Sequence, residues 1–315
     1  MRLTKLSFLI IFCFCSGCQT KHSENKKQKP SQYITVLGIA QDAGYPQINC
    51  EKECCQLFHQ GLEDKKMVSC LGLVDLNDKK KWLFDATPDL SEQLEELKAN
   101  HLDNNKIIDG VFLTHAHIGH YTGLMYFGHE ALGANNIEVY AMPRMKDYLS
   151  NNGPWGQLVS YKNIVIRPLT NDSTISLNNN LKVTPFLVPH RDEYSETVGY
   201  KIEGKNKSAL FIPDINKWPI WNKNIIEEVK KVDYAFLDAS FFKDGELKRD
   251  MSKIPHPFTS ETTTLFENET IETKSKIYFI HFNHTNPTIL DNHKLKDSIQ
   301  NLGFNFAKEG MIFPL

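Results

Sequence analysis

The sequence predicts a single domain of mixed α/β type over residues 33–315. Two observations support this fold class. Short apolar, β-branched runs alternate with segments of helical periodicity, and neither an internal repeat nor a linker interrupts the sequence after Tyr33. Of the 315 residues, 41% are hydrophobic and 23% charged, which suits a globular protein with a sizeable core. The formal net charge of -2 gives no indication of nucleic-acid binding.

Residues 1–18 have the pattern of an export signal peptide. Arg2 and Lys5 give a positive start, and the mainly apolar run that follows is shorter than the about 20 residues that a membrane-spanning helix needs. The signal ends in Ser-Gly-Cys at Cys18, which resembles a bacterial lipoprotein cleavage box. We therefore expect an exported cell-envelope lipoprotein, anchored in the membrane through Cys18 and the polar, lysine-rich tether of residues 19–32. A plain signal for a periplasmic or secreted protein is the alternative.

The predicted elements of the domain follow in order. Strands are placed at residues 33–37, 68–75, 81–84 and 110–113. A helix is predicted after the third strand, with Thr87 as its cap, Pro88 at its first position and leucines along one face. A second helix is predicted from His120 to about Phe127. Later strands are placed at residues 181–188, 197–202, 209–212, 234–237 and 277–280.

Four predicted strands end at side chains that can bind a metal. These side chains are His115, His190, Asp214 and His281. A sheet fixes the positions of its strand ends, while the loops that leave it expose side chains. We therefore expect these residues to surround a common cation.

The sequence Thr-His-Ala-His-Ile-Gly-His at residues 114–120 is the strongest indication of function. It contains His115, His117 and His120 directly behind a buried strand. Two histidines one residue apart can turn toward one ion, and the third can reach a neighbouring position. Neutral imidazole is a good ligand for zinc or iron. The alternative is a set of exposed loop histidines, which rarely cluster in this way.

This segment resembles the His-x-His-x-Asp-His signature of the metallo-β-lactamase superfamily. His190, Asp214 and His281 resemble that superfamily's next histidine, its bridging aspartate and its last ligand. The resemblance implies a four-layer αββα sandwich with the metal at the edge between its two sheets. It also implies one or two catalytic ions, with zinc expected first and iron or manganese as alternatives.

Gly119 departs from the signature, because the superfamily usually has aspartate there. Its loss removes an anionic ligand from the second metal position, which would keep His120, His281 and the shared Asp214. Either this position binds more weakly, or another carboxylate replaces the missing one. Asp42, in the loop after the first strand, is the candidate replacement, with an ordinary turn aspartate as the alternative.

Three segments are similar to the family of pyrroloquinoline quinone biosynthesis protein B (PqqB). They are residues 37–50, 249–257 and 281–287. We interpret the chain as a PqqB-like paralogue. This similarity implies an alternative function, that of an iron-dependent oxidase or hydroxylase acting on a peptide or an amino acid.

His256 lies just before a predicted helix start at Thr259. Similarity to phosphodiesterases of the superfamily implies that this histidine contacts phosphate or protonates the leaving group. Imidazole suits the role because its ordinary pKa of about 6.5 lies close to working pH. The alternative is a structural loop histidine.

Cys50, Cys54 and Cys55 are crowded into a short segment after the first loop, which favours a metal site over a disulfide. Resemblance to phosphodiesterases of the phosphonate pathway implies a structural zinc whose fourth ligand is His284. His59 is a local alternative for the fourth ligand, and a disulfide involving Cys70 is the alternative to a metal.

Together these patterns predict a hydrolase that uses metal-bound hydroxide. Asp214 would orient the water and His256 would serve the leaving group. A phosphodiester is the first expected substrate, by analogy with hydrolytic relatives, and a lactam or thioester is the alternative. Besides the PqqB-like oxidase, a non-catalytic, metal-binding envelope lipoprotein remains as an interpretation because of Gly119.

Overall fold

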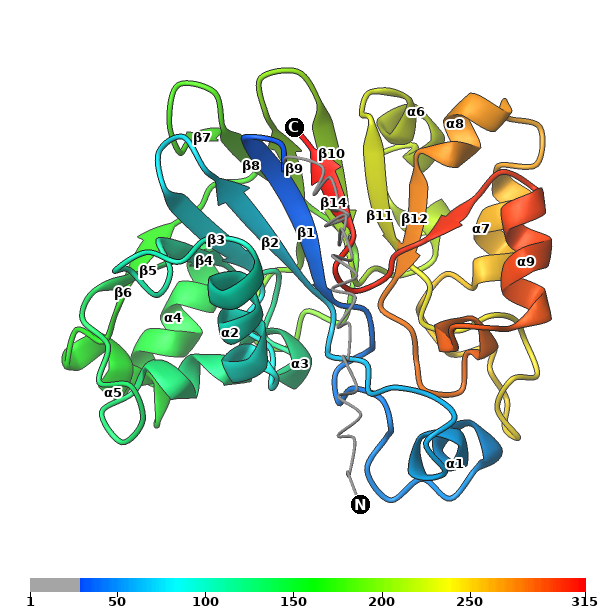
Figure 1. Cartoon of the computed structure of the whole chain (residues 1–315), viewed down its shortest axis with the longest axis horizontal. Coiled ribbons are helices and arrows are strands. Elements are labelled where there is room, and N and C mark those ends of the chain that lie inside the picture. The colour runs from blue at the N-terminus through cyan, green and yellow to red at the C-terminus, as the bar shows by residue number, and fades with distance from the viewer. Residues whose placement is uncertain (1–28) are drawn as a thin grey trace, which may run out of the picture.

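The computed structural model describes residues 29–315, which form two facing seven-stranded sheets with helices outside them (Figure 1). The first sheet has the order β14-β1-β2-β3-β4-β5-β6 and the second the order β13-β12-β11-β10-β9-β8-β7. The four-layer αββα sandwich that the sequence implied is therefore confirmed.

The strands of the first sheet are β1 (Gln32–Gly38), β2 (Cys70–Asp75), β3 (Lys80–Phe84), β4 (Gly110–Phe112), β5 (Ile137–Ala141), β6 (Ile164–Pro168) and β14 (Ile312–Pro314). Those of the second sheet are β7 (Ile175–Ser176), β8 (Lys182–Leu187), β9 (Val198–Glu203), β10 (Ser208–Ile212), β11 (Tyr234–Asp238), β12 (Ile277–Ile280) and β13 (Asn305–Phe306). The predicted strands are all present, each with bounds within two residues of the prediction at either end.

The helices are α1 (Glu53–His59), α2 (Leu90–Asn100), α3 (Ile118–Tyr121), α4 (Pro143–Asn151), α5 (Trp155–Ser160), α6 (Ile225–Lys230), α7 (Thr259–Leu265), α8 (Ile271–Ser275) and α9 (Lys294–Asn301). Short 3-10 turns are η1 (Thr122–Phe127), η2 (Trp218–Ile220) and η3 (Pro287–Ile289). In Figure 1, α2 to α5 lie outside the first sheet, and α7 and α9 lie outside the second.

Two helix predictions were wrong in detail. The helix after β3 begins at Leu90 with Asp89 before it, because Thr87 and Pro88 form a turn in which the Thr87 hydroxyl accepts a hydrogen bond from the Asp89 amide. The helix expected from His120 to Phe127 is two pieces, α3 and η1. A third detail concerns α7, where the Glu261 side chain accepts from the Phe258 amide, so that the cap precedes Thr259.

Alternating side chains divide the first sheet between two hydrophobic cores. In β1, Ile34 and Val36 belong to the core between the sheets, whereas Tyr33 and Leu37 pack under the helices of the first sheet. The inner core is aromatic: the rings of Phe84 and Phe211, from opposite sheets, lie 6.1 Å apart. This packing fixes the two sheets relative to each other, and so fixes the strand ends at their shared edge.

The strand ends that carry candidate ligands meet because of the strand directions. β10, β11 and β12 are parallel, and β8 runs the same way because β9 is antiparallel to both β8 and β10. Their carboxyl ends therefore lie at one edge of the second sheet. The Val198 amide donates to the carbonyl of Thr114 at 3.1 Å, which joins the end of β4 to that edge.

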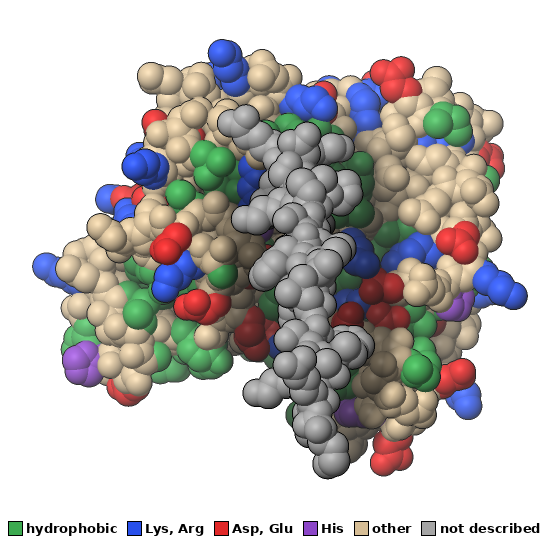
Figure 2. Space-filling view, in the orientation of Figure 1, with side chains coloured by type: hydrophobic (Ala, Val, Ile, Leu, Met, Phe, Trp, Pro, Cys, Tyr) green, Lys and Arg blue, Asp and Glu red, His purple; other side chains and the backbone are tan. Residues whose placement is uncertain are grey.

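On the face of the molecule in Figure 2, acidic and basic side chains are interspersed. Within residues 29–315, no helix has the length and apolar character needed to cross a bilayer.

Candidate metal centres

His115, His117, His190 and Asp214 form the first cluster, and their ligand atoms all lie within 4.8 Å of one another. Asp214 Oδ2 is 3.3 Å from His115 Nε2, 3.2 Å from His190 Nε2 and 4.0 Å from His117 Nδ1. Three imidazole nitrogens therefore converge on one carboxylate oxygen. Three nitrogens and one oxygen are a donor set that suits zinc.

Asp42, His120 and His281 form a second cluster beside the first. Asp42 Oδ1 is 3.4 Å from His120 Nε2 and 3.7 Å from His281 Nε2. Asp214 Oδ2 is 3.8 Å from His120 Nε2, so this aspartate lies between the two clusters. The structure thus brings together all seven residues that the sequence suggested for the catalytic metals, around one shared carboxylate.

Asp85 orients the loop of residues 114–120, here called the histidine loop. The sequence analysis did not identify this aspartate. It is fully buried at the end of β3 and accepts hydrogen bonds from the Thr114 amide at 2.7 Å and from His120 Nδ1 at 2.7 Å. Fixing Nδ1 turns His120 Nε2 toward Asp42. The signal was an ionisable residue directly after the apolar run of β3, the same signal that identified Asp214.

Asp238, the last residue of β11, was also missed. It is fully buried, and its Oδ2 lies 2.8 Å from His256 Nδ1. The Ser240 hydroxyl donates to its Oδ1 at 2.8 Å and lies 3.0 Å from His281 Nδ1. Asp238 therefore positions both a candidate ligand and the candidate acid.

Backbone strain coincides with the site. Asp85 and His281 have φ values of 72° and 66°, in the left-handed region that residues with a Cβ rarely adopt. Such a conformation costs about 1–3 kcal/mol and persists only where the surrounding structure enforces it.

Burial and the carboxylates shift the pKa values in opposite directions across the site. Burial holds the pKa of His115 well below its ordinary value, so this imidazole is neutral and able to bind a metal. Burial also acts to lower the pKa of His281, but Asp238 and Asp42 outweigh it and raise that pKa to about 9. The positively charged surroundings hold the pKa of Asp214 well below its usual range despite its burial.

Four buried polar atoms of this site lack hydrogen-bond partners among the described residues: Asp42 Oδ1, His120 Nε2, Asp214 Oδ1 and His281 Nε2. An unpaired buried polar group costs about 1–3 kcal/mol. A cation among these atoms would satisfy all of them, so the residues present fit a bound metal.

His256 is buried beside the first cluster, where the sequence expected a residue that serves the leaving group. Its Nδ1 is 3.1 Å from Asp214 Oδ1 in addition to its contact with Asp238. Burial acts to lower the pKa of His256, but these two carboxylates raise it to about 10.

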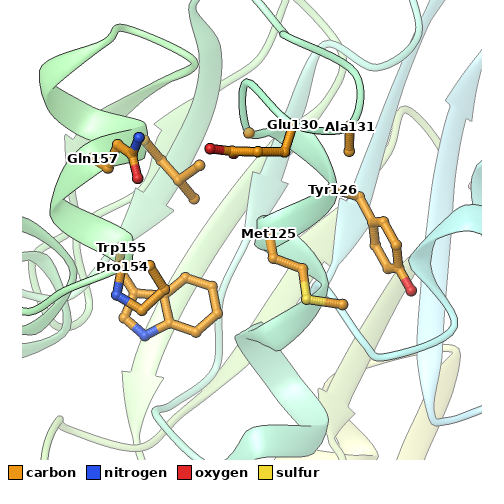
Figure 3. A pocket seen from close by; sticks show the side chains of 9 residues that line it. Met125, Tyr126, Glu130, Ala131, Pro154, Trp155 and Gln157 are labelled. Atoms are coloured by element: carbon orange, nitrogen blue, oxygen red, sulfur yellow. The ribbon is translucent and has the colours of Figure 1, made fainter.

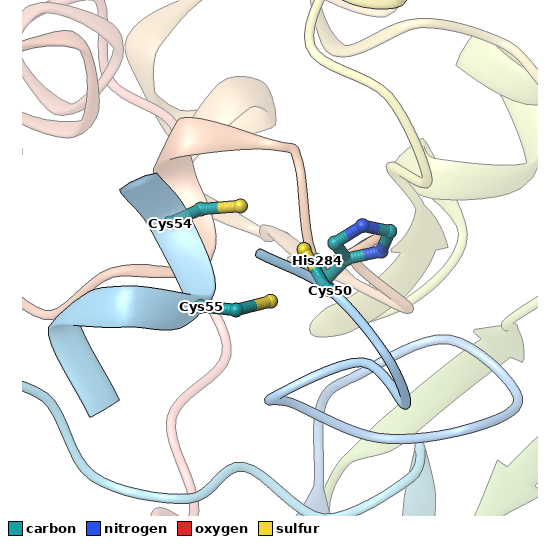
Figure 4. A group of neighbouring side chains, drawn as sticks. All are labelled: Cys50, Cys54, Cys55 and His284. Carbon is teal, nitrogen blue, oxygen red and sulfur yellow. The ribbon is translucent and has the colours of Figure 1, made fainter. Parts of the chain in front are cut away.

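Cys50, Cys54, Cys55 and His284 form a separate cluster in which the ligand atoms again lie within 4.8 Å of one another. Figure 4 shows the three sulfur atoms and the His284 ring around a common space, with two cysteines on α1. His284 Nδ1 is buried and has no hydrogen-bond partner in the part of the chain that the structure describes. Burial raises the pKa of the Cys55 thiol to about 12.

Of the two histidines considered for this cysteine cluster, the structure places His284 beside the three cysteines. His59, at the end of α1, is not part of it. Cys70 is buried in β2, where its thiol donates to the Asp85 carbonyl, and the four cysteines of residues 29–315 are free. A disulfide involving Cys70 is therefore absent from the described structure. Cys18, the predicted acylation site, lies outside the described residues.

An apolar pocket of about 350 Å³ lies away from both clusters, beside η1 and α5. Figure 3 shows Met125, Tyr126 and Trp155 among its lining side chains. The Trp155 ring packs at 4.9 Å against that of Tyr121, which follows His120. The contact between Trp155 and Tyr121 links the wall of this pocket to the segment after His120, and none of the candidate ligands lines the pocket.

Comparison with known proteins agrees with this arrangement. Residues 80–282 match the family described as "Beta-lactamase superfamily domain". Coenzyme PQQ synthesis protein B of Gluconobacter oxydans (strain 621H) is 26% identical over 307 residues, which cover 90% of this chain and 98% of that protein.

Two solved structures have the same fold. The Zn(2+)-bound PqqB from Methylobacterium extorquens has a TM-score of 0.73 at 21% identity, covering 90% of this chain and 100% of that one. A diphosphatase from the PhnP family has a TM-score of 0.63 at 22% identity, covering 90% of this chain and 98% of that one.

Proposed function

The chain belongs to the metallo-β-lactamase superfamily, and from that premise we propose that it is a metal-dependent hydrolase whose substrates are phosphodiesters. The observation that carries the proposal is the pair of clusters that share Asp214 Oδ2 at the buried edge between the sheets. Zinc is the expected metal, by the donor set and because a related PqqB structure contains it. The name of the PhnP-family diphosphatase supports a phosphorus-containing substrate by analogy only.

A divalent cation at this edge would supply a water of lowered pKa and a polarised phosphoryl group. Asp214 would orient that water, since it lies between the two clusters and is held by His115 and His190. Asp85 holds the Thr114 amide and His120 Nδ1, and the Thr114 hydroxyl lies 3.0 Å from His115 Nδ1, which would keep the attacking side of the site rigid.

His256 would protonate the leaving oxygen. Its Nδ1 pairs with Asp238 Oδ2 at 2.8 Å, so Nε2 is the nitrogen left for the substrate. The Asp238 and Asp214 carboxylates raise the pKa of His256 to about 10, which keeps the ring protonated at neutral pH and ready to donate.

The test is turnover of bis(p-nitrophenyl) phosphate by protein loaded with zinc or manganese, alongside Asp214→Asn. We expect hydrolysis by the wild-type protein and its loss in the variant. Turnover that is equal in the two proteins, or absent with every metal and every phosphodiester tried, would contradict the proposal.

Relationship to PqqB favours one second candidate, an iron-dependent oxidase or hydroxylase. Iron in protein purified without added metal, together with oxygen consumption in the presence of a peptide or amino acid, would favour it over the hydrolase. Finding metal but neither activity would favour a non-catalytic, metal-binding envelope protein.

We also propose a lipid anchor on Cys18, from the sequence of residues 1–18 alone. Incorporation of labelled palmitate into the wild-type chain but not into Cys18→Ser, with release of the variant from the membrane fraction, is the expected result. Unlabelled wild-type protein would leave the plain secretory signal.

A further inference from the structure

The loop after β1 fills the space that a side chain at position 119 would need. A Cβ built on Gly119 would lie 2.4 Å from Asp42 Cα and 2.5 Å from Asp42 Oδ1. Real Cβ atoms do not approach other atoms so closely, so glycine is the residue that this contact allows. The Asp42 carboxylate thus lies where a side chain on residue 119 would begin.

Backbone hydrogen bonds to both sheets hold this loop in place. The Gln41 amide donates to the Phe282 carbonyl at 2.8 Å, and Ala40 bridges to both Val68 and Phe282. Phe282 directly follows His281. These backbone contacts, which join the two sheets, therefore also place Asp42 beside His281.

The contacts of Asp42 differ from those of an ordinary turn aspartate. A turn aspartate accepts hydrogen bonds from backbone amides close by in the chain. Asp42 Oδ1 is buried and accepts none from any described residue, although a third of the side chain as a whole is exposed. It points instead at His120 Nε2 and His281 Nε2, which are equally without partners.

We propose that Asp42 is a ligand of a second divalent cation, together with His120, His281 and the shared Asp214, and that it replaces the carboxylate absent at Gly119. The inference rests on the proposed function for the presence of the first cation. Two imidazoles with two carboxylates suit zinc, iron or manganese. An aspartate at position 119 and Asp42 cannot both be present in this arrangement, because the loop that holds Asp42 occupies the space that a side chain at position 119 would need.

The experiment compares metal binding by wild-type protein, Asp42→Ala and Asp42→Asn, each stripped of metal and titrated with Zn²⁺ by calorimetry, with elemental analysis of the reloaded protein. Asp172→Ala is the matched control, since Asp172 is another loop aspartate with positive φ but pairs with Lys223 far from the site. We expect Asp42→Ala to lose one zinc equivalent, or to bind that ion at least about 100-fold more weakly, because even indirect partners of ligands contribute 10–100-fold. Asp172→Ala should bind as the wild type does.

A second readout does not depend on catalysis. Electron paramagnetic resonance of protein loaded with Mn²⁺ should show a spin-coupled pair in the wild type and isolated ions in Asp42→Ala. Unchanged melting of the metal-free variants, measured by circular dichroism, would show that the fold is intact. Should Asp42→Ala misfold, the isosteric Asp42→Asn gives the same comparison.

The outcomes separate this inference from the proposed function. A cation lost in Asp42→Ala without any phosphodiester turnover by the wild type supports Asp42 as a ligand and contradicts the hydrolase. A wild-type hydrolase with one cation at the histidines, or with two that Asp42→Ala retains at unchanged affinity, overturns the role of Asp42.

Discussion

The histidine–aspartate site, which comprises the first and second clusters, and the cysteine cluster are assembled in opposite ways. The histidine–aspartate site takes its residues from the ends of strands in both sheets, separated by long stretches of sequence. The cysteine cluster takes three ligands from a loop and the short α1, and only His284 from elsewhere. At the histidine–aspartate site, packing of the hydrophobic core sets the positions of the candidate ligands. At the cysteine cluster, one short helix and its loop set the positions, with Cys55 buried and Phe58 packed against the core.

This difference teaches which cluster depends on its metal for structure. Two packed sheets position the histidines whether or not a cation is present. The loop around α1 has its own anchor in the Tyr45 hydroxyl, which donates to the Cys54 carbonyl, but α1 is only seven residues long. Isolated helices of that length are marginal. We therefore expect loss of metal to abolish catalysis at the histidine–aspartate site, and to unfold the segment around α1 at the cysteine cluster.

The largest expected effect is that of His115→Ala. Hydrolysis should fall by about a thousandfold or more, because the ring is one of the three imidazoles facing Asp214. Elemental analysis should show less zinc at the histidines and full occupancy at the cysteines, with a native circular dichroism spectrum. An unfolded His115→Ala variant would contradict the comparison, because the histidine–aspartate site would then also be needed for the stability of the fold.

His256→Gln should lower kcat by about a hundredfold while the metal content stays at the wild-type level, because general acids contribute 10²–10⁴-fold. The loss should be larger for phosphodiesters with an alkoxide leaving group than for those releasing p-nitrophenolate, which needs little protonation. Equal losses for both substrates would assign His256 to the structure of the site instead.

Cys54→Ser should have the reverse profile. We expect loss of the cysteine metal, faster proteolysis within residues 46–66, and a melting temperature lower by about 2–4 °C for each kcal/mol lost in a domain of this size. Activity should change less than about tenfold. Cys70→Ser is a control for removing a thiol outside the cluster, and metal content unaffected by Cys54→Ser would remove the second site from the comparison.

The smallest effect concerns Glu309, whose carboxylate accepts a hydrogen bond from the Met67 amide in the segment between α1 and β2. Burial raises its pKa to about 7 from the ordinary 4.5, so the folded state binds more protons than the unfolded state between those values. Stability should therefore fall as pH rises from about 4.5 to 7, by at most about 3 kcal/mol. Glu309→Gln should lack this decline in urea unfolding curves. Parallel curves for the two proteins would refute the assignment.

Prediction from the sequence was most accurate where a residue pattern indicates a single structure or role. Apolar runs predicted the strands of the inner core, and the side chains after them that could bind a metal are the candidate ligands that surround Asp214. The residues that orient those ligands escaped notice: Asp85 and Asp238 also follow apolar runs, but a lone carboxylate reveals its partner only when the fold brings a histidine to it.

Local competition explains the remaining errors. Thr87 and Pro88 have good capping chemistry, yet the Thr87 hydroxyl closes a turn with Asp89 and delays α2. The strands β5 and β6 went unpredicted, as did the short β7, β13 and β14, because moderate apolar patterns become strands only through pairing, here of β5 with β4 and of β6 with β5. The choice of His284 over His59 depends on a long-range contact that spacing cannot supply.

The last strand of the chain closes against the first. β14 pairs with β1, the Gly310 amide donates to Val36, and the loop carrying Asp42 continues directly from that strand. Residues 310–314 therefore help to fix the loop that carries Asp42, because they hold the strand from which that loop leaves.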